Sequence, residues 1–284
     1  MSAQLTPLRG NAAGRNAALR APSEPQVILL ASGKSGQGTS TVAALLAILS
    51  ASEGTRVLLV DAASCPAGLA SLLGVQPDEA PARTRDASAL LEEMVLPISD
   101  TLSLLSVGLP TRDAPRRATG ERRALLRWLA PLYARYDLVV IDGGSRLESI
   151  AALTVSPPTK LIAVTSTDRV AVPSTYALVK ALDARTPAIP VEVLVNGAPA
   201  AAAVTVFREL DTATQLFLQR RVDYAGAIPD DAGLRAATLA GIPVQQAAID
   251  SPVVSAIHQL GARMRRELVH RSAPATESRF SNWR

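Results

Sequence analysis

Runs of apolar residues alternate with stretches of helical periodicity along most of the chain. The first run, residues 27–31, leads into a glycine loop, and residues 41–52 then repeat their apolar positions with a helical period. Continuously apolar runs of this length are typical of strands that are buried on both faces of a sheet. Further apolar runs span residues 57–61, 102–107, 138–142, 160–166, 191–196 and 225–228.

The segments between the apolar runs predict helices. Strands that alternate with helices indicate a parallel sheet joined by right-handed crossovers. The predicted fold is therefore a three-layer α/β/α arrangement, with a mostly parallel, twisted sheet and helices on both faces. The predicted helices are residues 41–52, 69–73, 86–94, 120–133, 172–182, 204–219 and 252–271.

The chain is expected to form one domain with a segment at each end. No Pro/Ser-rich linker divides it, so residues 26–271 are interpreted as a single domain. Residues 1–25 form a flexible basic leader in this interpretation, and residues 272–284 form a basic tail. The helix at 252–271 carries one apolar face, which fits either the last core helix or a membrane-seeking helix, and the core assignment is favoured.

The loop at residues 32–41 has the sequence Ser-Gly-Lys-Ser-Gly-Gln-Gly-Thr-Ser-Thr. A glycine loop at the start of a helix presents backbone N–H groups to an anion, and phosphate is its usual guest. The phosphate-loop consensus ends in Gly-Lys-Ser/Thr, whereas here Gly38 is followed by Thr39 and Ser40. Ser40 can supply a hydroxyl to Mg²⁺, but Thr39 cannot neutralise phosphate oxygens. The alternative is an ordinary Gly/Ser-rich turn.

This loop resembles the deviant phosphate loop of the MinD/ParA ATPases, which carries an additional lysine near its start. Lys34 occupies that position. In the family this lysine reaches across a nucleotide-sandwich dimer to the partner's phosphates. The resemblance therefore implies a P-loop fold and a nucleotide-dependent homodimer.

Two further strands resemble family motifs at their carboxyl ends. Asp61 matches the first of two aspartates in the family motif, but Ala63 occupies the position of the second. In the MinD branch this second aspartate helps to activate the attacking water. Asp142 resembles the Walker B acid near Mg²⁺, and Asn196 resembles the asparagine beside the adenine. The implied nucleotide-binding residues are Gly33, Lys34, Ser35, Gly36, Gln37, Gly38, Thr39, Ser40, Thr41, Asp61, Asp142 and Asn196, of which Ser40, Asp61 and Asp142 would bind the metal.

Thr39 and Ala63 together predict that ATP hydrolysis is lost, so no catalytic residue is assigned. Loss of one hydrogen bond to a charged group costs about 1.5–3 kcal/mol, which is about 10–100-fold in affinity. Binding of ATP or ADP with Mg²⁺ is therefore expected to be weakened. The hypothesis is a pseudo-ATPase.

The C-terminal third indicates a branch of the family. Residues 222–231, 240–244 and 250–252 follow the MinD-like pattern in order, and residues 175–180 and 218–229 are most similar to the flagellar-number regulators called FlhG or FleN. This resemblance implies control of flagellar number or placement through protein partners of the flagellar or another polar machinery. An active ATPase of division-site selection or DNA partition is one alternative, and an accessory protein of pilus or polysaccharide export is another.

Charge and cysteine usage narrow the expected partners. The net charge of +4 comes from arginine-rich ends, which leaves a slightly acidic body and makes a nucleic-acid partner unlikely. One cysteine, Cys65, and two histidines disfavour disulfides and zinc. We expect a cytoplasmic protein without a signal peptide, with at most a weak peripheral contact between residues 279–284 and the inner membrane.

Overall fold

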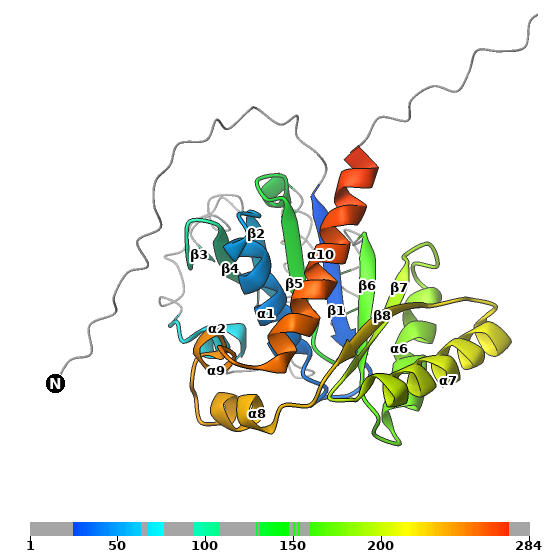
Figure 1. Cartoon of the computed structure of the whole chain (residues 1–284). Helices are drawn as coiled ribbons and strands as arrows, with labels where there is room; N and C mark the ends of the chain where they lie inside the picture. Colours follow the sequence, from blue (N-terminus) through cyan, green and yellow to red (C-terminus); the bar gives the residue numbers. More distant parts are fainter. Residues whose placement is uncertain are drawn as a thin grey trace, which may run out of the picture.

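The computed structural model describes residues 25–63, 68–76, 94–107, 129, 131–147, 150, 153 and 159–272, with side chains through residue 267. Its centre is an eight-stranded sheet in the order β3-β4-β2-β5-β1-β6-β7-β8 (Figure 1). The strands are β1 (Gln26–Ser32), β2 (Val57–Asp61), β3 (Val95–Pro97), β4 (Leu102–Ser106), β5 (Leu138–Asp142), β6 (Lys160–Thr165), β7 (Val191–Asn196) and β8 (Asp223–Ile228).

Helices cover both faces of this sheet, as the alternation of apolar runs and helical stretches predicted. Every described strand pair is parallel except β3 with β4, which is antiparallel. The three-layer prediction is therefore confirmed. The described helices are α1 (Thr39–Ser52), α2 (Gly68–Leu73), α6 (Ala171–Asp183), α7 (Ala200–Leu218), α8 (Ala232–Leu239), α9 (Val244–Ala247) and α10 (Pro252–Ser272).

Two apolar clusters fill the layers between sheet and helices. On β1, Val27 and Leu29 pack in the layer of α6 and α7, whereas Ile28 and Leu30 pack in the layer of α1 and α10. Successive side chains of a strand point to opposite faces, so one continuously apolar strand supplies both layers. This is the physical reason that the central strands lack an alternating polar face.

Helix α10 is a core helix in the part whose side chains are described. Val253, Ile257, Leu260 and Met264 are buried in the same cluster as α1. Full burial of such a side chain contributes about 1.5–3 kcal/mol. The core prediction for this helix is thus confirmed through residue 267, and the side chain of Leu268 lies outside the described residues.

A network of buried charges fastens α10 to the amino ends of β6 and β7. The ammonium group of Lys160 pairs with Glu192 of β7 and with Glu267 of α10, and Arg263 of α10 pairs with the second oxygen of Glu192. Arg263 also donates to the carbonyl of Tyr224 at 3.1 Å. Lys160 and Glu192 are only 5% and 6% exposed.

Several elements differ from the prediction, or lie where the structure does not test it. Strand β3 and helices α8 and α9 were not predicted, because each is short and has no sustained period. Helix α7 begins at Ala200, four residues before the predicted start, because a run of alanines has high helix propensity without an apolar face. Residues 1–24, Cys65, most of the predicted helices 86–94 and 120–133, and the tail after 272 lie outside the described residues.

Among the described helices, none combines the length and the apolar character that a membrane span requires.

Candidate functional site

The glycine loop lies at the carboxyl end of β1, a central strand, and leads directly into α1. Gly36 and Gly38 both have φ of +79°, a conformation that residues with a side chain rarely adopt. Gly38 is the N-cap of α1, and no side chain caps the helix. The first N–H groups of α1 are therefore available to an anion, as expected for a phosphate cradle.

Close contacts fix the shape of the loop. A Cβ atom at Gly33 would lie 2.1 Å from the carbonyl of Ser174, and one at Gly38 would lie 2.3 Å from Nδ2 of Asn196. Nδ2 of Asn196 donates to the carbonyl of Gln37 at 2.8 Å. Glycine at these positions thus lets the loop pack against α6 and the end of β7.

Three buried polar atoms around the loop have no hydrogen-bond partner among the described residues: Oε1 of Gln37, Oγ1 of Thr39 and Oδ2 of Asp142. An unsatisfied buried polar group costs about 1–3 kcal/mol, so such groups in native proteins need an explanation. A bound ligand with its hydration shell would supply the missing partners. This cluster is the strongest structural sign of a binding site at the loop.

The two predicted metal-binding carboxylates are neighbours at the ends of β2 and β5. Asp61 and Asp142 are opposite each other in the parallel register. Asp61 accepts from the N–H of Leu69 at 2.8 Å and from that of Ala63 at 3.2 Å. Asp142 accepts from the N–H of Gly144 at 3.0 Å.

Burial dominates the acidity of both carboxyl groups. The pKa of Asp61 is raised to about 6: burial is the main cause and the nearby Asp142 adds to it, against hydrogen bonds from the N–H groups of Leu69 and Ala63 that lower it. Burial also raises the pKa of Asp142, against hydrogen bonds from Ser40 and Gly144 that lower it. A cation would favour the charged form of both groups.

These groups suit Mg²⁺ as part of a shared coordination shell. Two carboxylates and the Ser40 hydroxyl are oxygen ligands, which Mg²⁺ prefers, and Mg²⁺ in nucleotide sites takes its remaining ligands from phosphates and water. The described residues contain no group of three or more His, Cys, Asp or Glu side chains that could hold a metal by themselves.

Lys34 lies in the same loop but turns towards its own chain. Its ammonium group pairs with Asp168, in the segment between β6 and α6, and both side chains are partly exposed. The hydrogen bond from Lys34 lowers the pKa of Asp168. The sequence predicts that Lys34 reaches a partner's phosphates, and it gives no sign of Asp168 as its partner within the chain.

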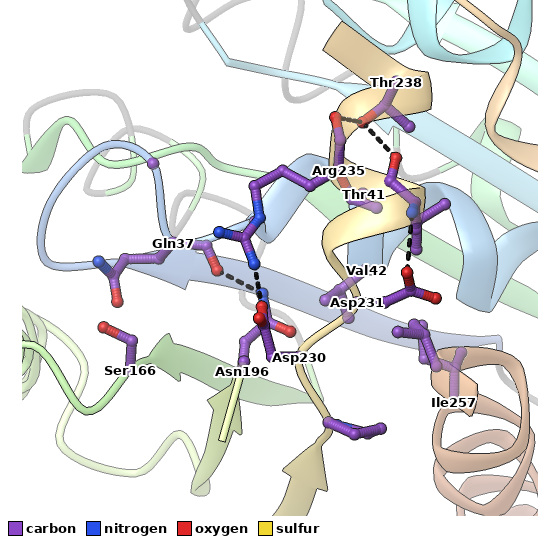
Figure 2. A pocket seen from close by; sticks show the side chains of 16 residues that line it. Gln37, Thr41, Val42, Ser166, Asn196, Asp230, Asp231, Arg235, Thr238 and Ile257 are labelled. Atoms are coloured by element: carbon purple, nitrogen blue, oxygen red, sulfur yellow. Dashed lines mark hydrogen bonds and ion pairs between the residues drawn. The ribbon is translucent and has the colours of Figure 1, made fainter. Parts of the chain in front are cut away.

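A pocket of about 310 Å³ opens beside the loop and is large enough for a small ligand. It is lined by the loop and α1 on one side and by the segment from β8 to α8 on the other (Figure 2). Within it Arg235 pairs with Asp230, and Asp231 caps α8 by accepting from the N–H of Leu234 at 2.8 Å. The sequence had marked residues 222–231 as MinD-like without giving them a role.

The structure brings all the predicted site residues into one region. Asn196 contacts the loop, the Ser40 hydroxyl donates a hydrogen bond to Asp142, and Asp61 is adjacent to Asp142. Ser35 and Gly36 form the exposed tip of the loop, whereas Gln37 and Thr39 are buried. Their binding roles remain predictions. Asp168, Asp230 and Arg235 could not be recognised as site residues from the sequence, because no single motif contains all three.

The raised pKa of Asp61 makes the ligand-free protein less stable as the pH rises. The folded state holds the Asp61 proton more tightly than the unfolded state, where the pKa is near 3.8. The contribution is fully present below about pH 4 and is lost as the pH rises through about 6, at a cost of about 3 kcal/mol. Asp142 acts in the same direction.

Urea denaturation of the ligand-free protein at several pH values between 4 and 7 measures this loss. Asp61→Asn should make the free energy of unfolding depend less steeply on pH, whatever the variant's absolute stability. The other acids contribute equally to the natural protein and to the variant. An unchanged slope in the variant would show that Asp61 does not carry the effect.

The sheet is mostly parallel, and a glycine loop follows one of its central strands. Together with two carboxylates at strand ends and a pocket beside the loop, this arrangement is that of a P-loop nucleotide-binding protein. The family model described as "ParA: NUBPL iron-transfer P-loop NTPase" matches residues 24–265. The chain therefore belongs to the ParA family of P-loop NTPases.

Individual relatives agree with this assignment. The chain is 25% identical to the antiactivator FleN of Pseudomonas aeruginosa over 213 residues, which cover 75% of this chain and 76% of FleN. MinD of Pyrococcus furiosus has a TM-score of 0.62 at 22% identity, covering 85% of this chain and 99% of MinD. MinD of Pyrococcus horikoshii, complexed with Mg-ADP, has a TM-score of 0.63 at 22% identity, covering 88% and 99%. The structural likenesses show the shared fold.

Proposed function

We propose that this protein is a MinD-like regulator that binds ADP or ATP weakly with Mg²⁺, has lost efficient hydrolysis, and acts through protein partners to control the number or placement of flagella. The observation that carries the nucleotide part is the buried group of unpartnered polar atoms at the loop, on Gln37, Thr39 and Asp142. A phosphate group with its metal ion and bound water would supply the hydrogen-bond partners that these three atoms lack.

Thr39 supports the loss of hydrolysis. It occupies the first position of α1 and is 6% exposed, and the resemblance of the loop aligns its neutral side chain with the family lysine. A positively charged group at this point stabilises the transition state of phosphoryl transfer. Ala63, beside Asp61, cannot orient a water molecule as a carboxylate does. Two losses at one site argue more strongly than either alone.

The similarity to FleN supports a regulatory role with protein partners. FleN is named an antiactivator, a protein that acts on another protein. MinD of Aquifex aeolicus has been solved as a MinC:MinD complex, and it has a TM-score of 0.63 to this chain at 20% identity. We extend both features to this chain, together with a nucleotide-dependent homodimer in which Lys34 leaves Asp168 for the partner's phosphates.

Calorimetric titration of the purified protein with ADP and with ATP, each with and without Mg²⁺, tests the nucleotide part. We expect weak binding that requires Mg²⁺ for full affinity and is reduced by Asp142→Ala. Light-scattering mass measurement then reports whether nucleotide produces the dimer. Absence of binding by either nucleotide would refute this part of the proposal.

A steady-state phosphate-release assay tests the loss of hydrolysis. We expect turnover below about one per minute, far under the median enzyme rate of about 10 per second. Faster turnover that Asp142→Ala abolishes would instead establish an active ATPase, as in division-site selection or DNA partition. The flagellar role is tested separately, by counting flagella in cells that lack the gene.

A further inference from the structure

A second hollow of about 390 Å³ lies outside the nucleotide site, between the edge strand β8 and α10. We call it the β8–α10 groove. Ala225, Gly226 and Ala227 of β8 form its floor, and Ala256 and Leu260 of α10 line its side. Gly226 has φ of +134°, and a Cβ atom added there would have no heavy atom within 4 Å. The small side chains on β8 leave an apolar space that no side chain in the described part of the chain fills.

Among the described residues, the permanent charges that line the groove are those of two arginines. Among the described lining residues, the ionisable side chains are His258, Arg263 and Arg266, and none is acidic. His258 pairs with Glu53, and Arg263 pairs with Glu192. Arg266 is exposed and makes no hydrogen bond or ion pair with any part of the chain that the structure describes. Within the described residues, the groove therefore offers an apolar floor beside Arg266, which has no partner there, and Arg263, which is held by Glu192.

The backbone of β8 disfavours an additional strand at this edge. Tyr224 pairs with Val193 and Gly226 pairs with Leu194, so Ala225 is an extra residue in a β-bulge. A bulge on an edge strand disrupts the ladder of N–H and C=O groups that another strand would need. An occupant of the groove would therefore be held through its side chains, as a helix is when its apolar face lies in a groove.

The ends of this chain are unsuitable occupants because of their charge. Residues 1–24 carry three arginines and one glutamate, and residues 273–284 carry two arginines and one glutamate. Docking either segment would place like charges beside Arg266. An acidic segment is complementary to the groove, and complementary charge increases both the association rate and the specificity of binding.

We propose that the β8–α10 groove binds an acidic amphipathic helix of a partner protein. The apolar face of that helix lies on Ala225, Gly226 and Ala256, which are partly exposed, and its carboxylates lie against the exposed Arg266. This surface is distinct from the loop and its pocket. It adds to the proposed function a place where a regulatory partner binds, and it is tested without nucleotide, so that its failure and the failure of the nucleotide proposal are distinguishable.

The probe is a synthetic 18-residue peptide with leucines at helical spacing and glutamates on both flanks, labelled with fluorescein. Its matched control carries lysine in place of every glutamate. Fluorescence anisotropy with the full-length protein should show binding of the glutamate peptide only, weakening as salt increases. Arg266→Glu should reduce this affinity by about tenfold or more and should permit binding of the lysine peptide.

The control variant is Arg208→Glu, an exposed arginine on α7 with the same change in net charge. It should leave peptide binding unchanged, and thermal melts should show that both variants fold. Equal effects of the two variants, equal binding of the two peptides, or no binding at all would each overturn the proposal. Binding to vesicles with phosphatidylglycerol that only Arg266→Glu abolishes, with no binding of the peptide, would overturn it in favour of a lipid surface.

Discussion

Replacing Glu192 with alanine is expected to lower the free energy of unfolding by about 3–5 kcal/mol, because it removes the buried carboxylate that the buried Lys160 shares with Arg263. Lys160 and Arg263 both pair with this carboxylate, and Lys160 is only 5% exposed. Urea denaturation followed by circular dichroism measures the change. Nucleotide should be absent, so that binding does not contribute to the measured stability.

The matched control is Glu267→Ala, which removes a carboxylate from the same network where the side chain is 38% exposed. Water can replace this partner, so a loss of about 1 kcal/mol or less is expected. The double variant Lys160→Met/Glu192→Leu removes both buried charges and should recover most of the stability lost in Glu192→Ala. A loss below about 1 kcal/mol for Glu192→Ala would contradict this account of the network.

Replacing Thr39 with lysine is expected to raise the affinity for ADP and ATP by about 10–100-fold, because it restores a charged hydrogen bond to the phosphates. Thr39 already lies in the first turn of α1, and its hydroxyl has no partner among the described residues. Calorimetric titration measures the gain.

Thr39→Met separates charge from shape, because methionine has a similar length and no charge. It should bind nucleotide no better than the natural protein. An equal gain from methionine and lysine would mean that side-chain volume, rather than charge, limits binding at this loop. No gain from either variant would show that the threonine does not explain weak nucleotide binding.

Much of the fold could be predicted because the central strands are apolar on both faces and end at distinctive loops. The same pattern placed Asp61, Asp142 and Asn196 at strand ends, and the parallel sheet then brings strand ends together. The predicted binding residues therefore converge without any long-range information. Strand β3 escaped prediction because it has three residues and pairs antiparallel at the sheet edge.

The remaining site residues could not be predicted because they depend on tertiary contacts. Asp168 is 134 positions from Lys34, and Arg235 pairs with Asp230 in a segment whose sequence shows no chemical motif. The missing hydrogen bonds of Gln37 and Thr39 are likewise a property of packing. The loss of hydrolysis and the flagellar role were inferred from resemblance alone, and both remain predictions.

Helix α10 is a wall of two separate pockets. Val253 and Ile257 line the pocket beside the glycine loop, while Leu260 and Arg263, one turn further on, line the β8–α10 groove. The charge network fastens this helix to β6 and β7, so the two pockets share one wall that is fixed to the sheet. A partner that displaces α10 would thereby change nucleotide affinity, and thermodynamic linkage requires nucleotide to change partner affinity by the same factor. In such a protein the affinity for the partner would differ between the nucleotide-bound and nucleotide-free forms, and this difference would not require ATP hydrolysis.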